Sequence, residues 1–147
     1  MPTSTLTTFD DLAEQIGKAV HNFSTHTFKV ALSNTAPNAA TNAVLADITQ
    51  IAATGGYTAG AGGGYAVSGA SYTETAGTAT FTFTDLVITA TGGSVGPFRY
   101  AVLYNDTATT PADALIGFLD YGSAITLADT ETLTIDLGAS GILQVAA

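Results

Sequence analysis

The sequence predicts a mainly β protein, an antiparallel β-sandwich or a jelly-roll-like barrel with one N-terminal amphipathic helix. Apolar residues recur with the helical period only near the N-terminus, and over most of the remaining chain they alternate with polar residues. Gly, Asn, Asp and Pro separate these alternating runs at close spacing, which is typical of sandwiches and barrels. We expect residues 1–8 to form an extended N-terminal arm and residues 9–147 to form a single domain.

The helix is expected over residues 9–21. Its apolar residues recur at intervals of three or four and would face the core together: Phe9, Leu12, Ile16, Val20 and Phe23. Thr8 and Asp11 fit a capping box at the start of this helix, and Asn22 would end it.

The first strand is expected where the apolar period changes to two. Phe28, Val30 and Leu32 alternate with less apolar residues and predict this strand. Residues 34–54 predict a loop with one short helical turn. Residues 55–64 include six glycines among ten residues, which favours a flexible loop.

The rest of the chain predicts a series of short strands. One or two are expected within residues 65–75. In residues 78–84, Phe81 and Phe83 would face inward and the threonines would face outward. Further strands are expected at residues 86–91, 98–104, 114–121, 123–127, 131–137 and 141–145.

Arg99 is one of three cationic residues in the chain. It lies in the apolar run Pro97-Phe98-Arg99-Tyr100-Ala101-Val102-Leu103-Tyr104, which predicts a strand that is covered on both faces. A lone guanidinium in such a strand needs a carboxylate partner or a second subunit that closes over it. We therefore expect Arg99 to form an ion pair within or between subunits, and Arg99→Ala to weaken the assembly.

The charge balance limits the partners of the chain, which has 3 Lys+Arg, 12 Asp+Glu and a formal net charge of −9. Nucleic-acid binding depends on clustered cations, so nucleic acid is not an expected partner. No apolar stretch approaches the roughly 20 residues of a membrane-spanning helix, and anionic lipid surfaces repel an acidic chain, so no membrane association is expected. No secretory signal is visible at the N-terminus, which favours a protein made in the cytoplasm.

The surface is expected to carry few charges. Charged residues are 10% of the chain, against about 25% in typical domains. Two explanations stay open: threonines cover the solvent faces of a small β protein, or much of the surface lies against neighbouring subunits.

No catalytic or cofactor-binding pattern emerges. The glycine-rich segment 55–64 lacks the Gly-Lys-Ser/Thr ending of a phosphate loop, Gly-x-Ser-x-Gly is absent, and the chain has no cysteine. His21 and His26 are the only imidazoles, and we expect them at the surface or the helix end. We expect a protein that is not an enzyme and has no cofactor and no metal.

The C-terminal third holds six acidic residues: Asp106, Asp113, Asp120, Asp129, Glu131 and Asp136. They could form a calcium site, or they could occupy turns for backbone reasons alone. Loop carboxylates can bind calcium, but the EF-hand spacing is absent. Turns favour aspartate for backbone reasons. One of these acids is the expected partner of Arg99.

Several segments occur along the chain in an order that carries a resemblance: Gly17 to Phe23, Thr27 to Asn34, Ala46-Asp47-Ile48, Gly56-Tyr57-Thr58, Gly96 to Asp106, Leu115 to Gly122 and Gly141-Ile142-Leu143. Over residues 9–145 the chain resembles a family of small virion structural proteins of tailed bacteriophages. The resemblance implies a non-enzymatic capsid decoration or cement protein, made in the host cytoplasm and carried on the virion surface. Its expected partners are the major capsid protein and copies of itself, for example in a trimer. The alternative within the virion is a tail, neck or fibre-base component.

The expected subunit or capsid contacts come from the arm, the loops of residues 34–64 and the flanks of the 97–104 strand: Thr3, Thr5, Leu6, Tyr57, Tyr65, Arg99 and Tyr100. A second hypothesis is a glycan- or receptor-binding module on the virion. In that case Tyr57, Tyr65 and Tyr72 would stack on sugars.

Overall fold

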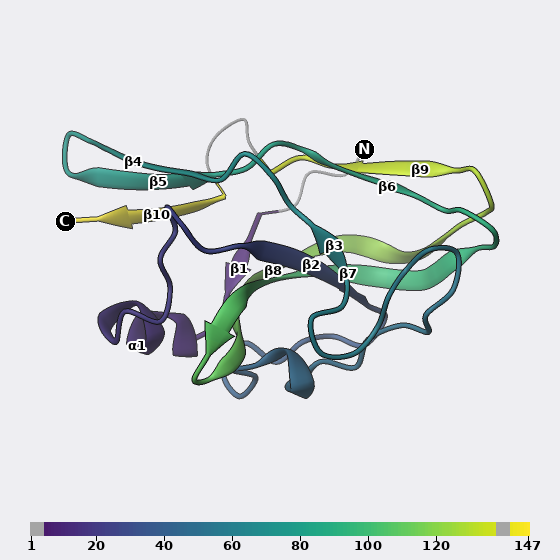
Figure 1. Cartoon of the computed structure of the whole chain (residues 1–147), viewed down its shortest axis with the longest axis horizontal. Helices are drawn as coiled ribbons and strands as arrows, with labels where there is room; N and C mark the ends of the chain where they lie inside the picture. Colours follow the sequence, from purple (N-terminus) through teal and green to yellow (C-terminus); the bar gives the residue numbers. More distant parts are fainter. Residues whose placement is uncertain (1–4, 138–141) are drawn as a thin grey trace.

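The computed structural model of the chain describes residues 5–137 and 142–147. It is mainly β, with antiparallel sheets and one α-helix, as the sequence predicts. The strands lie in two layers that pack face to face like a sandwich (Figure 1). Within the described ranges the strands close no barrel, so the jelly-roll-like barrel is not the architecture.

One layer is a five-stranded sheet with the order β1-β8-β7-β2-β3. Its strands are β1 (Thr7–Thr8), β2 (Phe28–Ser33), β3 (Tyr65–Ala66), β7 (Val95–Thr109) and β8 (Ala112–Leu127). The long antiparallel pair of β7 and β8 is the centre of the fold. The last residues of the predicted arm are thus an edge strand of this sheet, with Thr7 opposite Phe118 and Thr8 opposite Gly117.

Strand β8 replaces the two strands predicted at residues 114–121 and 123–127. Gly122 was the turn signal between them, but its φ of 95° is accommodated inside the strand. The register shifts there, because Phe98 lies opposite Ile125 while Tyr100 lies opposite Asp120. The extra residues of β8 therefore form a bulge rather than a turn.

The second layer consists of two small sheets joined end to end. Its strands are β4 (Ser71–Thr75), β5 (Thr78–Thr82), β6 (Leu86–Thr89), β9 (Thr132–Ile135) and β10 (Leu143–Ala146). One sheet has the order β10-β5-β4 and the other pairs β6 with β9. Backbone hydrogen bonding from Phe83 N to Leu137 O connects the two sheets, and Figure 1 shows them as one layer above the five-stranded sheet.

Helix α1 (Asp11–Gly17) is shorter than the predicted helix over residues 9–21. The chain leaves the helix after Gly17, because Ala19 takes a left-handed φ of 59° and Val20 N bonds back to Gln15 O. The predicted capping box is also wrong. The N-cap is Asp10, which makes no side-chain capping hydrogen bond, and Thr8 belongs to β1. The helical turn predicted within residues 34–54 is η1 (Leu45–Asp47).

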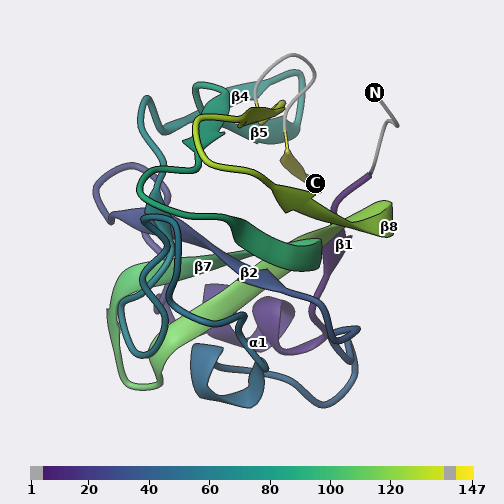
Figure 2. The same ribbon diagram turned by 90° about the vertical axis from the view of Figure 1, so that its right-hand side faces the viewer.

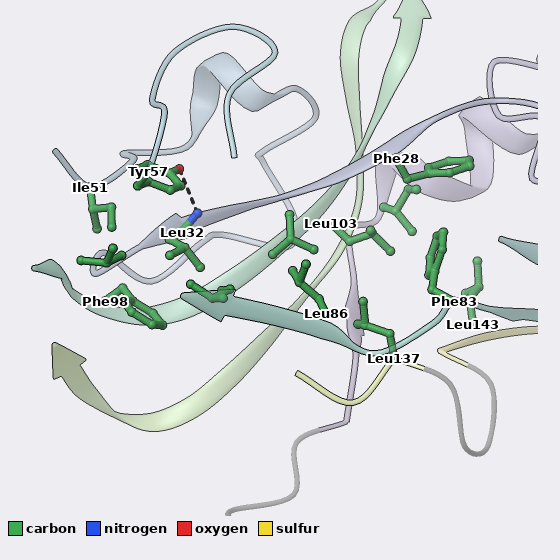
Figure 3. Close-up of a cluster of buried hydrophobic side chains, with 14 of the residues drawn as sticks. Phe28, Leu32, Ile51, Tyr57, Phe83, Leu86, Phe98, Leu103, Leu137 and Leu143 are labelled. Atoms are coloured by element: carbon green, nitrogen blue, oxygen red, sulfur yellow. Dashed lines mark hydrogen bonds between the residues drawn. The ribbon is translucent and has the colours of Figure 1, made fainter. Parts of the chain in front are cut away.

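Two apolar clusters cover the five-stranded sheet on both faces. The larger one lies between the layers and includes Phe28, Leu32, Phe83 and Leu103 (Figure 3). The smaller one joins residues of the sheet's other face to Phe9 and to η1: Phe9, Ala31, Leu45, Ile48, Val102, Tyr104 and Leu115. Figure 2 shows α1 and the helical turn on this side, away from β4 and β5.

Candidate contact surfaces

Arg99 forms an ion pair with Asp120 inside one chain, as one of the two sequence alternatives predicts. Arg99 Nε and Nη2 donate hydrogen bonds to the two carboxylate oxygens at 2.7 and 2.9 Å. The Arg99 guanidinium lies over the Tyr100 ring, 5.3 Å from its centroid. Gly122 N donates to the same carboxylate at 2.8 Å, so the pair fastens the β8 bulge to β7.

The Arg99–Asp120 pair is partly exposed. The prediction that the 97–104 strand is covered on both faces is therefore wrong at Arg99. The side chains of Arg99 and Asp120 are 39% and 38% exposed. Two-sided burial holds further along β7, where Val102, Leu103 and Tyr104 are at most 2% exposed. The hydrogen bonds from Arg99 hold the pKa of the Asp120 carboxyl below its usual range.

Tyr57 is part of the core and presents no contact surface. Its ring is 3% exposed. Its hydroxyl accepts a hydrogen bond from Leu32 N at 3.0 Å (Figure 3). The same hydroxyl donates one to Gln50 Oε1 at 2.8 Å. Burial raises the pKa of Tyr57 to about 12. The Tyr57 hydroxyl therefore ties the glycine-rich segment to strand β2.

The predicted flexible loop at residues 55–64 is fixed on the sheet at several further points. Lys29 Nζ donates to Gly62 O at 2.7 Å, Gly62 N donates to Asp113 at 3.2 Å, and the Tyr104 hydroxyl donates to Gly63 O. Gly64 has a φ of +95°, and a Cβ there would lie 2.3 Å from Val30 O. Glycine at position 64 thus lets the loop backbone touch β2, so this segment is a packed connection.

The remaining predicted contact residues are spread over the molecule. Tyr65 is half-buried and packs on Tyr57 with 5.6 Å between ring centroids. Tyr100 is 8% exposed and makes an edge contact with Phe118. Thr5 is exposed and Leu6 is half-buried against the core, while Thr3 lies outside the described residues. The structure does not bring the predicted contact residues together into one surface.

Two sets of outward, uncharged side chains lie instead on the outer face of the second layer, one on each of its two sheets. Residues of β5, β6 and β9 alternate between the core and this outer face, since Phe81, Leu86, Ile88, Leu133 and Ile135 pack inward. We call the outward set the threonine face: Ser71, Thr73, Thr75, Thr78, Thr80, Thr82, Val87, Thr89, Thr132 and Thr134.

The threonine face is built from directly opposed pairs. Thr73 lies opposite Thr80, Thr75 opposite Thr78, and Thr89 opposite Thr132. Val87 is 56% exposed in the same face, opposite Thr134. The sequence reading placed the threonines of residues 78–84 outward, which is correct. It did not show that β4, β6 and β9 extend the same face, because this depends on strand pairing.

Charges lie at the margins of the threonine face and at the junction between its two sheets, where Asp85 and Asp136 are exposed. Asp85 is at the junction of β5 and β6, where its carboxylate accepts a hydrogen bond from Leu137 N, and Glu131 comes just before β9. Glu74 has the opposite orientation in β4 and pairs with Ala79. Uncharged polar and apolar groups cost less to desolvate than charges, so this face is the one most suited to contact with another protein.

The two histidines meet at a buried asparagine, which the sequence reading missed. Asn105 is fully buried, and its Nδ2 lies 3.2 Å from His21 Nδ1 and 2.9 Å from His26 Nδ1. His21 is 7% exposed and stacks on Phe23, so it is not a surface histidine. Burial lowers the pKa of His21 to about 4, with a smaller contribution from the charge of His26. This cluster joins the segment after α1 to strand β7.

Two further properties concern residues 5–137 and 142–147, the part of the chain that the structure describes. In these ranges no three His, Cys, Asp or Glu side chains are grouped as a metal site would require. The same ranges contain no helix with the length and hydropathy needed to cross a bilayer. Comparisons with protein-family models, with curated proteins and with solved structures gave no match for this chain.

Proposed function

We propose that this chain is a non-enzymatic structural protein of a tailed-phage virion, and that it decorates and stabilises the capsid by binding the shell of major capsid protein. The observation that supports the proposal most is the threonine face, an uncharged outer sheet surface on a chain with a net charge of −9. The resemblance of the sequence to small phage virion proteins supports the particle as the place of action.

The physical argument concerns where the charges lie. Eight of the twelve acids lie outside the strands, for example Asp10, Asp47 and Asp129, and the four within strands are not part of the threonine face: Glu74, Asp106, Asp113 and Asp120. A bound subunit would then turn an acidic, well-hydrated side to the solvent and its uncharged side to the shell. Protein interfaces are depleted of charge at their centres in the same way.

The predicted residue set is revised within this proposal. Tyr57 and Tyr100 are buried, so their side chains are not available for contact with the shell. Arg99 is satisfied by Asp120 in its own chain and serves the β7–β8 bulge. The threonine face takes the place of the loops at residues 34–64 as the proposed contact.

The glycan-binding hypothesis has less support than before. It relied on exposed tyrosines, yet Tyr57 is buried and Tyr72 packs inward against Phe23 and Phe81. A tail, neck or fibre-base position stays a second proposal, because the same uncharged face would serve a contact there.

Cosedimentation with assembled capsids tests the proposal. The probe is the capsid of the phage whose genome encodes the chain, mixed with the wild-type chain or with Thr80→Glu. The substitution places a charge at the centre of the threonine face and should weaken binding at least tenfold, since an unpaired charge would be desolvated. The control is Thr41→Glu, an exposed loop residue outside this face, which should bind as the wild type does. Equal binding by Thr80→Glu would reject the threonine face as the contact, and no binding by the wild type would reject the cement role.

A further inference from the structure

A groove separates helix α1 from the edge strand β10. It has a volume of about 720 Å³ and is lined on one side by residues of the Thr8–Ile16 segment and on the other by β10. Phe9 and Leu12 lie almost fully buried in its floor. Figure 1 shows β10 above α1, at the end of the sandwich opposite β6 and β9. The volume is in the range of pockets that bind ligands, about 300–1,000 Å³.

Strand β10 presents an unprotected sheet edge to this groove. In the part of the chain that the structure describes, β10 pairs only with β5, through residues Leu143 to Ala146. Proteins usually protect such edges with charges, proline or bulges. The sequence of β10, Leu-Gln-Val-Ala, contains no charge and no proline. Val145 is 38% exposed on this strand and is one of two exposed large apolar side chains.

The charges at the groove indicate what kind of segment would fit there. Asp10 lines the groove and is exposed, and among the described residues its carboxylate has neither a hydrogen bond nor an ion pair. Among the described residues that line the groove, Asp10 alone carries a charged side chain. A cationic side chain placed over Asp10 would therefore be favoured.

None of the Lys and Arg side chains, all of which the structure describes, is left unpaired to interact with Asp10. All three basic residues of the chain already pair with acids: Lys18 with Glu14, Lys29 with Asp106 at 3.1 Å, and Arg99 with Asp120. A second copy of this chain would bring a net charge of −9 and no unpaired Lys or Arg. A partner with a different sequence fits the groove better than a copy does.

We propose that this groove binds an extended segment of a different protein, which adds to β10 as a further strand and places a lysine or arginine beside Asp10. Main-chain hydrogen bonds to the free edge would supply affinity, and alternate apolar side chains would enter the groove between β10 and Leu12. Four residues, or about 13 Å of strand, would match the length of β10. This site is distinct from the threonine face, which points to the other side of the same layer.

The test uses the whole chain and defined peptides, namely hexapeptides of alternating valine and threonine that carry one lysine at either end, and matched peptides with glutamate in place of lysine. We expect saturable binding of a lysine peptide in calorimetry, with slowed amide exchange in residues 143–146. The glutamate peptides should bind at least tenfold more weakly.

Three variants assign the binding to the groove. Val145→Asp should abolish it, and Asp10→Asn should reduce the preference for lysine over glutamate to less than threefold. Asp85→Asn removes a charge outside the groove, keeps the acceptor for Leu137 N and should change nothing. Thr134→Glu changes the threonine face on β9, which does not pair with β10, and should also leave peptide binding intact, which separates this proposal from the one for the threonine face.

Four results would overturn the proposal. They are no binding of any lysine peptide by the folded wild-type chain, equal affinity for lysine and glutamate peptides, protection from exchange in the free chain of those amides of residues 143–146 that do not bond to β5, and a concentration-dependent dimer that Val145→Asp dissociates. The last two would assign the edge to this chain's own residues or to a second copy. Circular dichroism of each variant checks folding, and Asp10→Asn, at an exposed position, keeps the test valid if Val145→Asp does not fold.

Discussion

Arg99 and Asp120 form a two-pronged ion pair across the β7–β8 bulge, with N to O distances of 2.7 and 2.9 Å. Neither group is buried, so the pair acts in contact with solvent. Exposed pairs of this kind contribute little to stability unless their geometry is bidentate. The Gly122 amide, within the bulge, donates to the same carboxylate, so the pair stabilises the bulge in β8.

Arg99→Ala should lower the melting temperature at pH 7, by less than the core truncation Leu103→Ala does. The pKa of Asp120 is lowered in the folded chain, so its contribution is present above the unfolded pKa of about 4 and is lost as the pH falls through the folded pKa. Melting curves of both proteins at pH 7 and near pH 2 measure this. The difference should shrink at low pH, and a difference that stays constant would show that the ion pair is not its source. Arg99→Lys keeps the positive charge but loses the bidentate geometry. Its melting temperature at pH 7 should therefore lie between those of the wild type and Arg99→Ala.

His21 should make folding sensitive to mild acid. Its folded pKa of about 4 lies below the unfolded value of about 6.5, so only the unfolded chain takes up a proton between these values. Stability is therefore complete above pH 6.5 and falls as the pH drops toward 4, by about 3 kcal/mol at most. Asn105, His26 and Phe23 face the imidazole, and the more distant charge of Asp11 opposes the shift.

Urea unfolding of the wild type and of His21→Gln at pH 7, 5.5 and 4.5 measures this effect. The free energy of unfolding of the variant should vary less with pH in this window. Parallel curves for the two proteins would mean that His21 does not titrate differently in the folded and unfolded chain.

Tyr57→Phe should cost about 1–3 kcal/mol of stability, because it leaves the buried Leu32 N without its hydrogen-bond acceptor. Tyr72→Phe is the matched control. Tyr72 is half-buried among Phe23 and Phe81, and its hydroxyl takes part in none of the hydrogen bonds found in the described ranges. Chemical denaturation compares the two variants, and equal losses would contradict the role given to the Tyr57 hydroxyl.

Two Gly→Ala substitutions should have opposite effects. A Cβ at Gly117 would lie 2.8 Å from both Leu6 Cγ and Thr7 O, so Gly117→Ala should displace β1 and cost about 1–3 kcal/mol. Nothing lies within 4 Å of a Cβ at Gly17, so Gly17→Ala should be neutral or stabilise α1 by up to about 1 kcal/mol. Amide exchange at Phe9, whose N bonds to Ile116 O, should quicken in Gly117→Ala alone. Unchanged exchange there would show that β1 does not depend on this close approach.

The parts of the fold that depend on residues close together in the sequence could be predicted from their hydrophobic pattern. Alternation in residues 78–84 predicted the inward Phe81 and Phe83 correctly. The end of α1 was missed because both Gly17 and Asn22 are stop signals, and only the left-handed Ala19 decides between them. The pattern predicts a turn at Gly122, where the structure has a bulge, because glycine supplies a positive φ in both.

The contact surfaces depended on pairing between distant strands, which a single sequence does not display. An acid partner for Arg99 was expected, but choosing Asp120 requires the register that places it opposite Tyr100. Tyr57 lies among glycines, and its burial depends on Leu32 N, 25 residues earlier in the chain. The threonine face likewise needs β6 paired with β9.

The most direct test of the proposed capsid role is a cryo-electron microscopy map of a phage virion in which this chain can be located. The account predicts density for this chain on the outside of the capsid shell, with the threonine face of β4, β5, β6 and β9 toward the major capsid protein. Density in the tail, neck or fibre base would contradict the cement role.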